Sequence, residues 1–221
     1  MRPPGTSLLI GGGVVFAFLA VGCASADGGG TGVTPEPADG AIRLAAVGDS
    51  ITEADSPDFG AGRLGTESWV HHAVGEDVAL VGGWAQWGAT TAEMAAAVEP
   101  EDADVLVIMA GTNDLGGGEP REETLANIRD IAQTVDAEDV VLSAVPPLDR
   151  TPDVATALNA DLEALARDEG WHWVDAAAAV RDGERFAEGT TVDGVHPTTR
   201  GAELIGARVR AVVLEAAGRG T

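Results

Sequence analysis

The segment IRLAAVGDSI, residues 42–51, joins an apolar run to a polar turn. The run Ile42–Val47 is interrupted only by Arg43 and has the length of a buried β-strand. Gly48 permits the unusual backbone angles or close backbone approach of a tight turn. Ser50 would then project from the carboxyl end of the strand, where open α/β sheets bind their ligands. Because glycine, aspartate and serine are also ordinary turn residues, this segment alone does not establish a nucleophile.

Four more apolar runs of strand length follow, separated by segments with helical periodicity. They are Val78–Val81, Asp104–Ala110, Val140–Val145 and Trp171–Val174. Alternating strands and helices are typical of a parallel sheet with helices on both faces. The sequence therefore predicts an α/β fold, a three-layer α/β/α sandwich with about five parallel strands and about five helices.

The helical segments carry boundary signals and apolar faces. Thr90 and Glu93 have the spacing of a capping box. Thr151 and Pro152 open a later helix, which Gly170 closes. The apolar positions expected on the inner faces of the last three long helices are Leu125, Ile128, Ala132 and Val135, then Val154, Leu158, Leu162 and Leu165, then Leu204, Ile205, Val209, Val212 and Val213.

The charge of the chain excludes several classes of partner. Its 221 residues include 13 basic residues, all arginine, against 36 acidic ones, for a net charge of -23. This balance argues against nucleic acid and against adsorption to anionic lipid. A single cysteine excludes an intrachain disulfide and a cysteine-based zinc cluster, and the four histidines show no metal-ligand spacing. We therefore expect no metal, no cofactor and a monomer.

The amino terminus has the composition of a secretory signal. Arg2 precedes the apolar, glycine-rich run Leu8–Val21, which is short for a transmembrane span. We interpret residues 1–22 as a signal of the lipoprotein type. Residues 23–40 contain little that could be buried and are interpreted as a flexible tether. The catalytic domain is then expected over residues 41–221.

Cys23 suggests how the protein is retained at the cell surface. The segment Leu19–Cys23 resembles a bacterial lipobox, in which the cysteine is lipidated and becomes the first residue, although Ala20 replaces the usual leucine. The resemblance implies an extracytoplasmic lipoprotein that meets the membrane only through its lipid anchor. The alternative is an ordinary cleaved signal and a secreted soluble protein.

Polar segments follow the third predicted strand and precede the last helix. They are GTND, residues 111–114, and DGVHP, residues 193–197. Serine attack on a carbonyl needs a base, a carboxylate that orients the base, and donors for the oxyanion. The short loop from Asp193 to His196 lets the carboxylate reach one imidazole nitrogen while the other faces Ser50. These side chains are expected to converge at the carboxyl edge of the sheet.

Four segments in order resemble the blocks of the SGNH, or GDSL, hydrolases. They are Gly48–Thr52, Gly83–Thr91, Gly111–Asp114 and Asp193–Pro197, and the similarity covers about residues 42–215. The resemblance implies a flavodoxin-like fold and hydrolysis of esters through a covalent acyl-serine.

The resemblance also implies a role for individual residues. Ser50 is the nucleophile, His196 the base and Asp193 the residue that orients it. The oxyanion donors are the backbone amides of Ser50 and Gly88 and the side chain of Asn113. Two departures exist: Ala54 replaces a glycine often found four residues after the nucleophile, and in the second block the usual asparagine and first glycine are replaced by Gly83 and Ala85.

Other residues near these blocks admit simpler interpretations. The GAGRLG segment, residues 60–65, satisfies a dinucleotide-binding pattern but follows no strand, so we interpret it as a loop. That loop, Glu53–Thr66, is a candidate border of the active site. His71 and His72 are interpreted as partly buried or solvated helix residues. Asp49 and Asp114 are interpreted as braces of their turns.

The tryptophans have competing interpretations. Trp84 and Trp87 flank the proposed oxyanion glycine and could form an aromatic wall for the acyl group, with core packing as the alternative. Trp171 and Trp173 are expected to pack in the core or cover the sheet.

We expect an ester hydrolase acting on a small-molecule or glycan ester, with short acyl groups favoured because no segment resembles a long lid. Two alternatives remain open at this stage: an acyltransferase using the same acyl-enzyme with a sugar hydroxyl as acceptor, and a non-catalytic binding lipoprotein.

Overall fold

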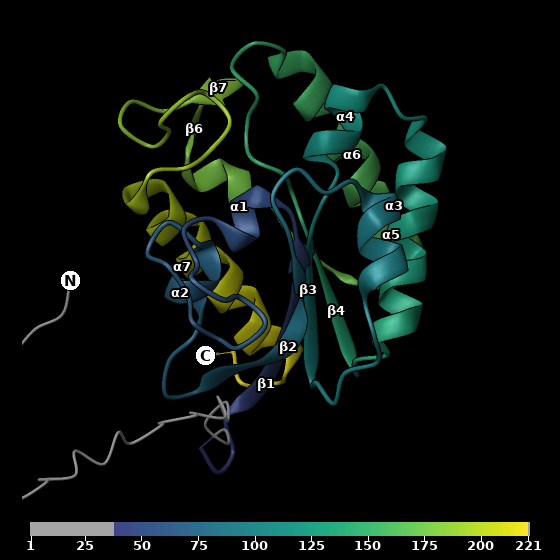
Figure 1. Cartoon of the computed structure of the whole chain (residues 1–221), viewed down its shortest axis with the longest axis vertical. Coiled ribbons are helices and arrows are strands. Elements are labelled where there is room, and N and C mark those ends of the chain that lie inside the picture. Colours follow the sequence, from purple (N-terminus) through teal and green to yellow (C-terminus); the bar gives the residue numbers. More distant parts are fainter. Residues whose placement is uncertain (1–37, 221) are drawn as a thin grey trace, which may run out of the picture. The chain divides into compact units, whose positions relative to one another are not determined.

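A computed structural model describes residues 38–220 of the chain (Figure 1). The predicted signal and Cys23 lie outside the described residues. The first strand begins at Ile42, next to the expected domain start. Among residues 38–220, no helix combines the length and the apolar character needed to cross a membrane.

Five parallel strands form the central sheet, in the order β2-β1-β3-β4-β5. Their bounds are β1 Ile42–Gly48, β2 Val78–Ala85, β3 Val105–Met109, β4 Asp139–Ser143 and β5 His172–Val174. This arrangement confirms the predicted fold class. β2 is longer than expected because it continues past a register shift opposite Leu44 and Ala45.

Helices cover both faces of this sheet (Figure 1). Their bounds are α1 Ser50–Glu53, α2 Trp69–Ala73, α3 Thr91–Ala97, α4 Thr112–Gly117, α5 Arg121–Val135, α6 Pro152–Glu169 and α7 Thr199–Ala216. α2 and α7 pack on one face, and α3, α5 and α6 on the other. After β5 come a 3-10 helix, Ala176–Ala179, and an antiparallel hairpin of β6 Arg181–Asp182 and β7 Arg185–Phe186. The hairpin was not predicted, because two-residue strands are too short to show a periodicity.

Alternate residues of the strands feed two separate hydrophobic cores. Leu44 and Ala46 of β1 face the core beneath α2 and α7, whereas Ala45 and Val47 face the core beneath α3, α5 and α6. This alternation follows from the two-residue period of a strand. Burying each large aliphatic side chain contributes about 1.5–3 kcal/mol relative to leaving it exposed. β1 is therefore held from both sides, and the turn that follows it is fixed with it.

The predicted helix boundaries are confirmed at two helices. Thr90 accepts a hydrogen bond from the amide of Glu93, and the Glu93 carboxylate accepts one from the amide of Thr90. α6 begins with Pro152 after Thr151 and ends at Gly170 in the left-handed region.

The predicted helix faces are mostly right, with one error. Val154 is exposed, because the buried stripe of α6 runs through Ala155, Leu158 and Leu162 and so begins one residue later. Three predicted core residues are only partly buried at the edges of their stripes: Leu125, Leu204 and Val212.

Candidate active site

Ser50 is the second residue after β1 and the first residue of α1. Asp49 caps α1 by accepting a hydrogen bond of 2.9 Å from the amide of Ile51, so the chain turns from β1 into the helix at Ser50. At Gly48 a Cβ atom would overlap Thr52 and the carbonyl of Met109, so the close approach of the backbone requires glycine there. The turn places Ser50 at the carboxyl edge of the sheet, as the sequence predicted.

The loop before α7 brings an imidazole to this serine. The Oγ of Ser50 lies 3.0 Å from Nε2 of His196, and Nδ1 of His196 lies 2.8 Å from Oδ2 of Asp193. A carboxylate accepts from Nδ1–H, which leaves Nε2 as an acceptor for the serine hydroxyl. The structure therefore brings the three predicted residues into one hydrogen-bonded line.

Asp193 also holds the loop that carries the imidazole. Its Oδ1 accepts hydrogen bonds from the amides of Val195, at 2.9 Å, and His196, at 2.8 Å. Partial burial acts to raise the pKa of the Asp193 carboxyl, but the hydrogen bonds from His196 and Val195 and the charge of His196 outweigh it and lower the pKa below its usual value. The lowered pKa favours the ionised carboxylate, which can accept a hydrogen bond from Nδ1–H of His196.

The three predicted oxyanion residues stand after three neighbouring strands. Ser50 follows β1, Gly88 lies in the loop after β2, and Asn113 is the second residue of α4, after β3. Gly88 has a φ of +76°, in the left-handed region that favours glycine. Nδ2 of Asn113 donates to the carbonyl of Ala89 at 2.9 Å. An amide nitrogen has two hydrogens, so this bond orients the group and leaves one donor free. Their role as oxyanion donors stays a prediction.

The two aspartates interpreted as braces differ in what they hold. Asp49 caps its own turn, as predicted, but its other oxygen is buried without a hydrogen-bond partner. Burial raises the pKa of Asp49 to about 6, against lowering effects from the Ile51 amide and the charge of His196. Asp114 instead accepts from the amide and hydroxyl of Thr91, and so ties α4 to the start of α3.

A hollow of about 160 Å³ opens beside the serine. Ser50, His196 and Trp87 line it, together with Ala54 of the loop that was expected to border the site. Trp84, by contrast, packs against the core beneath α3 and α5. The sequence could not decide between wall and core for these two tryptophans, and the structure gives each residue a different role.

The remaining predictions concern residues outside the site. Residues 60–65 form a loop closed by a bridge between Asp58 and Arg63. His71 is exposed, and Nε2 of the half-buried His72 lies 2.9 Å from the carbonyl of Thr66. Both findings fit the non-catalytic interpretations. Trp171 and Trp173 are partly buried and cover the sheet.

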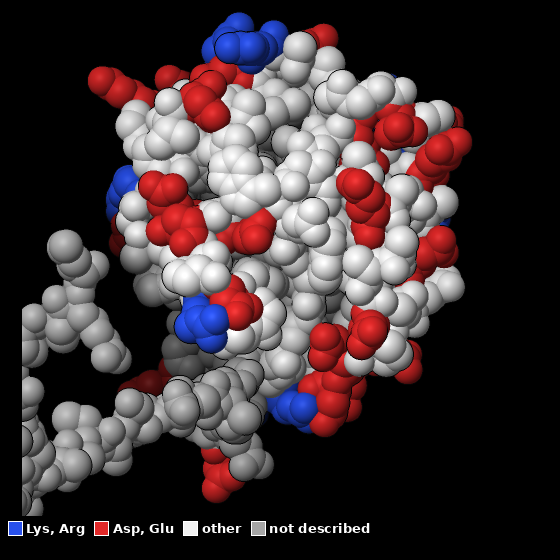
Figure 2. Space-filling model, viewed as in Figure 1, with Lys and Arg blue, Asp and Glu red and all other residues white. Residues whose placement is uncertain are grey.

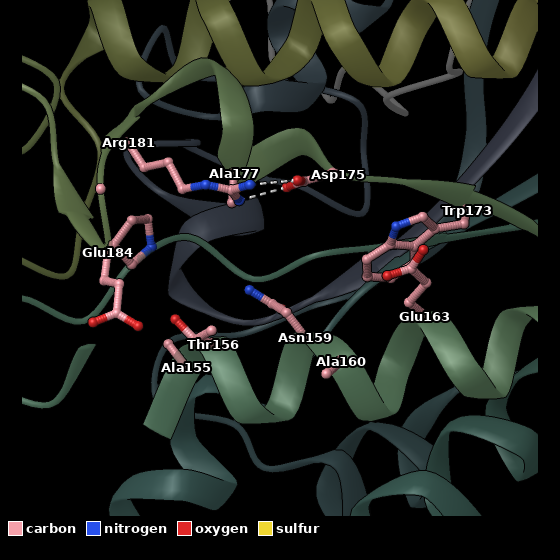
Figure 3. A pocket seen from close by; sticks show the side chains of 12 residues that line it. Ala155, Thr156, Asn159, Ala160, Glu163, Trp173, Asp175, Ala177, Arg181 and Glu184 are labelled. Atoms are coloured by element: carbon pink, nitrogen blue, oxygen red, sulfur yellow. Dashed lines mark hydrogen bonds and ion pairs between the residues drawn. The ribbon is translucent and has the colours of Figure 1, made fainter. Parts of the chain in front are cut away.

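A second hollow, of about 300 Å³, lies between α6 and the β6-β7 hairpin (Figure 3). It contains none of the predicted site residues. The Arg181 guanidinium donates to both oxygens of Asp175, at 2.8 and 2.7 Å. The side-chain amide of Asn159 is bonded to the backbone of Val145 through both of its ends. These polar groups are occupied in holding the hairpin and α6 in place.

Acidic side chains outnumber basic ones on the face of the domain that Figure 2 shows. Among the described residues, most arginines are paired on the surface, as in the ion pair between Arg121 and Asp161.

The fold and the line of serine, imidazole and carboxylate define a carboxylic ester hydrolase. The sequence matches the GDSL-like Lipase/Acylhydrolase family over residues 46–204. This segment is more than half of the chain and includes Ser50, Gly88, Asn113, Asp193 and His196. The chain therefore belongs to the GDSL-like lipase and acylhydrolase family. No curated protein sequence matches it.

Solved structures of GDSL-type proteins share the fold. A GDSL-like lipase from Bacteroides thetaiotaomicron has a TM-score of 0.64 at 22% identity, over 81% of this chain and 91% of that one. A catalytic mutant of an acetylxylan esterase from Geobacillus stearothermophilus has a TM-score of 0.65 at 17% identity, over 83% and 97%. A lipolytic G-D-S-L family protein from Veillonella parvula has a TM-score of 0.62 at 19% identity, over 76% and 96%.

Proposed function

We propose that this protein hydrolyses short-chain or O-acetyl esters through an acyl-serine intermediate on Ser50. The observation that carries the proposal is the line of contacts at the carboxyl edge of the sheet, from Ser50 Oγ to His196 Nε2 at 3.0 Å and from His196 Nδ1 to Asp193 Oδ2 at 2.8 Å. These contacts connect a nucleophile, a base and a carboxylate, the groups that acyl transfer on a serine uses.

Acylation begins when Oγ of Ser50 attacks the ester carbonyl carbon and His196 Nε2 takes the hydroxyl proton. The carboxylate of Asp193 accepts from Nδ1–H and stabilises the imidazolium that forms. His196 then gives the proton to the oxygen of the leaving alcohol as the carbon–oxygen bond breaks. Water repeats the sequence on the acyl-serine: His196 takes a proton from water and returns it to Oγ, which releases the acid.

The negative charge that develops on the carbonyl oxygen needs donors fixed in advance. We assign this role to the backbone amides of Ser50 and Gly88 and to the free hydrogen of the Asn113 amide. The three residues follow adjacent strands, and Asn113 is already oriented by its bond to Ala89. Donors held this way need no reorganisation during the reaction.

The size of the hollow supports a small acyl group. At about 160 Å³, it is bounded by side chains of the triad and by Trp87. One of the structural neighbours is an acetylxylan esterase, which is consistent with an O-acetyl ester here. The strong net negative charge of -23 favours neutral esters over anionic ones.

The test combines labelling with a substrate series. A fluorophosphonate probe should label the wild type at Ser50, and Ser50→Ala should lose both labelling and turnover. Ser56→Ala is the matched control, because the Ser56 hydroxyl accepts only a loop amide. With nitrophenyl esters, kcat/KM should be highest for acetyl and fall as the chain lengthens. Labelling at another serine would refute the assignment, and a preference for long chains would refute the substrate class.

We also propose that the enzyme acts outside the cytoplasm, anchored through Cys23. This proposal rests on the amino-terminal sequence alone. Cys23→Ser should move the protein from the membrane fraction to the soluble fraction without changing esterase activity. Unchanged membrane association would refute the lipid anchor.

A further inference from the structure

Trp87 is an exposed residue that is nevertheless held firmly. Its relative exposure is 56%, which makes it one of the few large apolar side chains exposed among the described residues. Its backbone amide donates to a carboxylate oxygen of Glu53 at 2.6 Å, and its indole Nε1–H donates to the carbonyl of Ala54 at 2.9 Å. Two hydrogen bonds to the end of α1 therefore fix both the backbone and the ring.

The backbone at Ala54 supports this attachment. Ala54 has a φ of 48° and a ψ of -129°, a conformation that glycine adopts far more easily than alanine. The carbonyl that accepts from the Trp87 indole belongs to this strained residue. Surrounding contacts must therefore hold Ala54 in this conformation, and the hydrogen bond from Trp87 is one of them.

The fixed indole lies against the imidazole of the triad. The ring centroids of Trp87 and His196 are 4.8 Å apart and the ring planes differ by 25°, which is a stacked arrangement. An indole face carries partial negative charge and attracts a cation placed over it. His196 becomes a cation at the moment when the serine proton is transferred, so the stack strengthens along the reaction.

We propose that Trp87 is a positioning residue for His196: it holds the imidazole in line with Ser50 and stabilises the imidazolium. The inference rests on the proposed role of His196 as the base. The stack restricts rotation of the ring on one side, while Asp193 fixes its Nδ1 edge. The titratable groups that face the pair are Asp193, Glu53, Glu67 and the buried Asp49.

The kinetic test uses Trp87→Ala and Trp87→Phe, with Trp171→Phe as control because Trp171 lies just before β5, at the opposite end of the sheet. Trp87→Ala should lower kcat by about 2-fold to 30-fold, the effect of losing one cation–π contact. Its KM should change less than kcat. Trp87→Phe keeps an aromatic face and should recover most of kcat. An unchanged kcat with a raised KM would make Trp87 a wall for the substrate and would overturn the proposal.

A spectroscopic test needs no turnover. An imidazolium in contact with an indole quenches its fluorescence. The wild type should therefore emit less tryptophan fluorescence in an acidic buffer that protonates imidazoles than in an alkaline one. This loss should be absent in Trp87→Phe and in His196→Ala, and present in Trp171→Phe. A loss of the same size in Trp87→Phe would show that Trp87 does not stack on His196 in solution and would overturn the proposal.

The two proposals fail in different ways. A wild type that neither reacts with the fluorophosphonate probe nor hydrolyses esters would refute the proposed function, whatever Trp87 does. An active wild type whose Trp87→Ala variant keeps kcat and whose emission ignores pH would refute the role of Trp87 alone.

Discussion

The hollow between α6 and the β6-β7 hairpin and the hollow beside Ser50 differ in what their polar groups are free to do. In the larger one, Arg181 and Asp175 are paired with each other, and Asn159 is bonded to the backbone (Figure 3). In the smaller one, a hydroxyl, an imidazole and a carboxylate are connected in sequence, with the hydroxyl of Ser50 at the open end. Volume alone would select the wrong hollow. The connection of hydrogen-bonding groups identifies the one suited to acyl transfer.

The hollows also differ in how the chain builds them. The larger is lined entirely by residues 147–184, around α6 and the hairpin that follows β5. The smaller joins the turn after β1 and the loop after β2 to residues 192–197. The chemistry of a site assembled from distant segments changes when any one of them moves. The polar groups of the larger hollow instead stabilise one local part of the fold.

Asp193→Asn should cause the largest loss of activity at the site in the smaller hollow. Asparagine keeps an oxygen to accept from the amides of Val195 and His196, but it presents a donor to Nδ1 and so selects the wrong imidazole tautomer. We expect kcat to fall about 10³-fold to 10⁴-fold with the fold intact. Steady-state kinetics and thermal unfolding measure the two effects. Asp182→Asn, in the exposed hairpin, is the control, and equal activity of the two variants would refute the triad.

Asn113→Ala should have the next largest effect. Removing one oxyanion donor lowers kcat by about 10²-fold to 10³-fold and leaves KM nearly unchanged. The matched variant is Asn159→Ala in the larger hollow, which removes an amide bonded to Val145 and should reduce stability but not kcat. If Asn113→Ala raises KM while kcat holds, Asn113 contacts the substrate instead.

Asp49 should make the stability of the domain depend on pH. Its pKa rises from 3.8 to about 6 on folding, so the folded state binds this proton more tightly than the unfolded state. The stabilisation is present below about pH 4 and is lost as the pH rises through about 6, by roughly 3 kcal/mol in total. Denaturant unfolding of wild type and Asp49→Asn from pH 4 to 8 measures it as a difference. If the stabilities of wild type and Asp49→Asn change with pH in parallel, Asp49 does not have a raised pKa in the folded protein.

Arg181→Ala should have the smallest effect. Its pair with Asp175 is about one-third exposed, and such pairs contribute about 1 kcal/mol or less. We expect a slightly lower unfolding midpoint and an unchanged kcat/KM. A drop in kcat/KM beyond about threefold, or roughly 0.65 kcal/mol of barrier, would mean that the two hollows work together.

Most of the fold and the triad could be predicted because their signals are local. A strand, a glycine and a serine specify the turn at Ser50, and Asp193 and His196 are close enough in sequence to predict their contact. Parallel strands then bring these loops to one edge. The same reasoning predicted Asn113 at this edge, whereas Gly88 was predicted only from the resemblance to the hydrolase family.

Contacts between loops could not be predicted. The stack of Trp87 on His196 depends on where two loops meet in space, and no periodicity encodes that. The bond from Thr91 to Asp114 links two helices that are separated by a strand. At Ala54 the missing family glycine suggested a local departure, but only the structure shows that the backbone kept the glycine conformation.

The position of α7 determines when during folding the active site can form. Ser50 and His196 are 146 positions apart in the sequence, and His196 precedes the helix that packs against α2 so closely that a side chain at Gly206 would overlap the carbonyl of Trp69. The entropy of closing such a loop is lost before its contacts are gained, so contacts of this kind form late. During refolding, catalytic activity should therefore return only after α7 has packed against the sheet and α2. Ester hydrolysis would then report the docking of the last long helix, whereas circular dichroism reports helix formation summed over the whole chain.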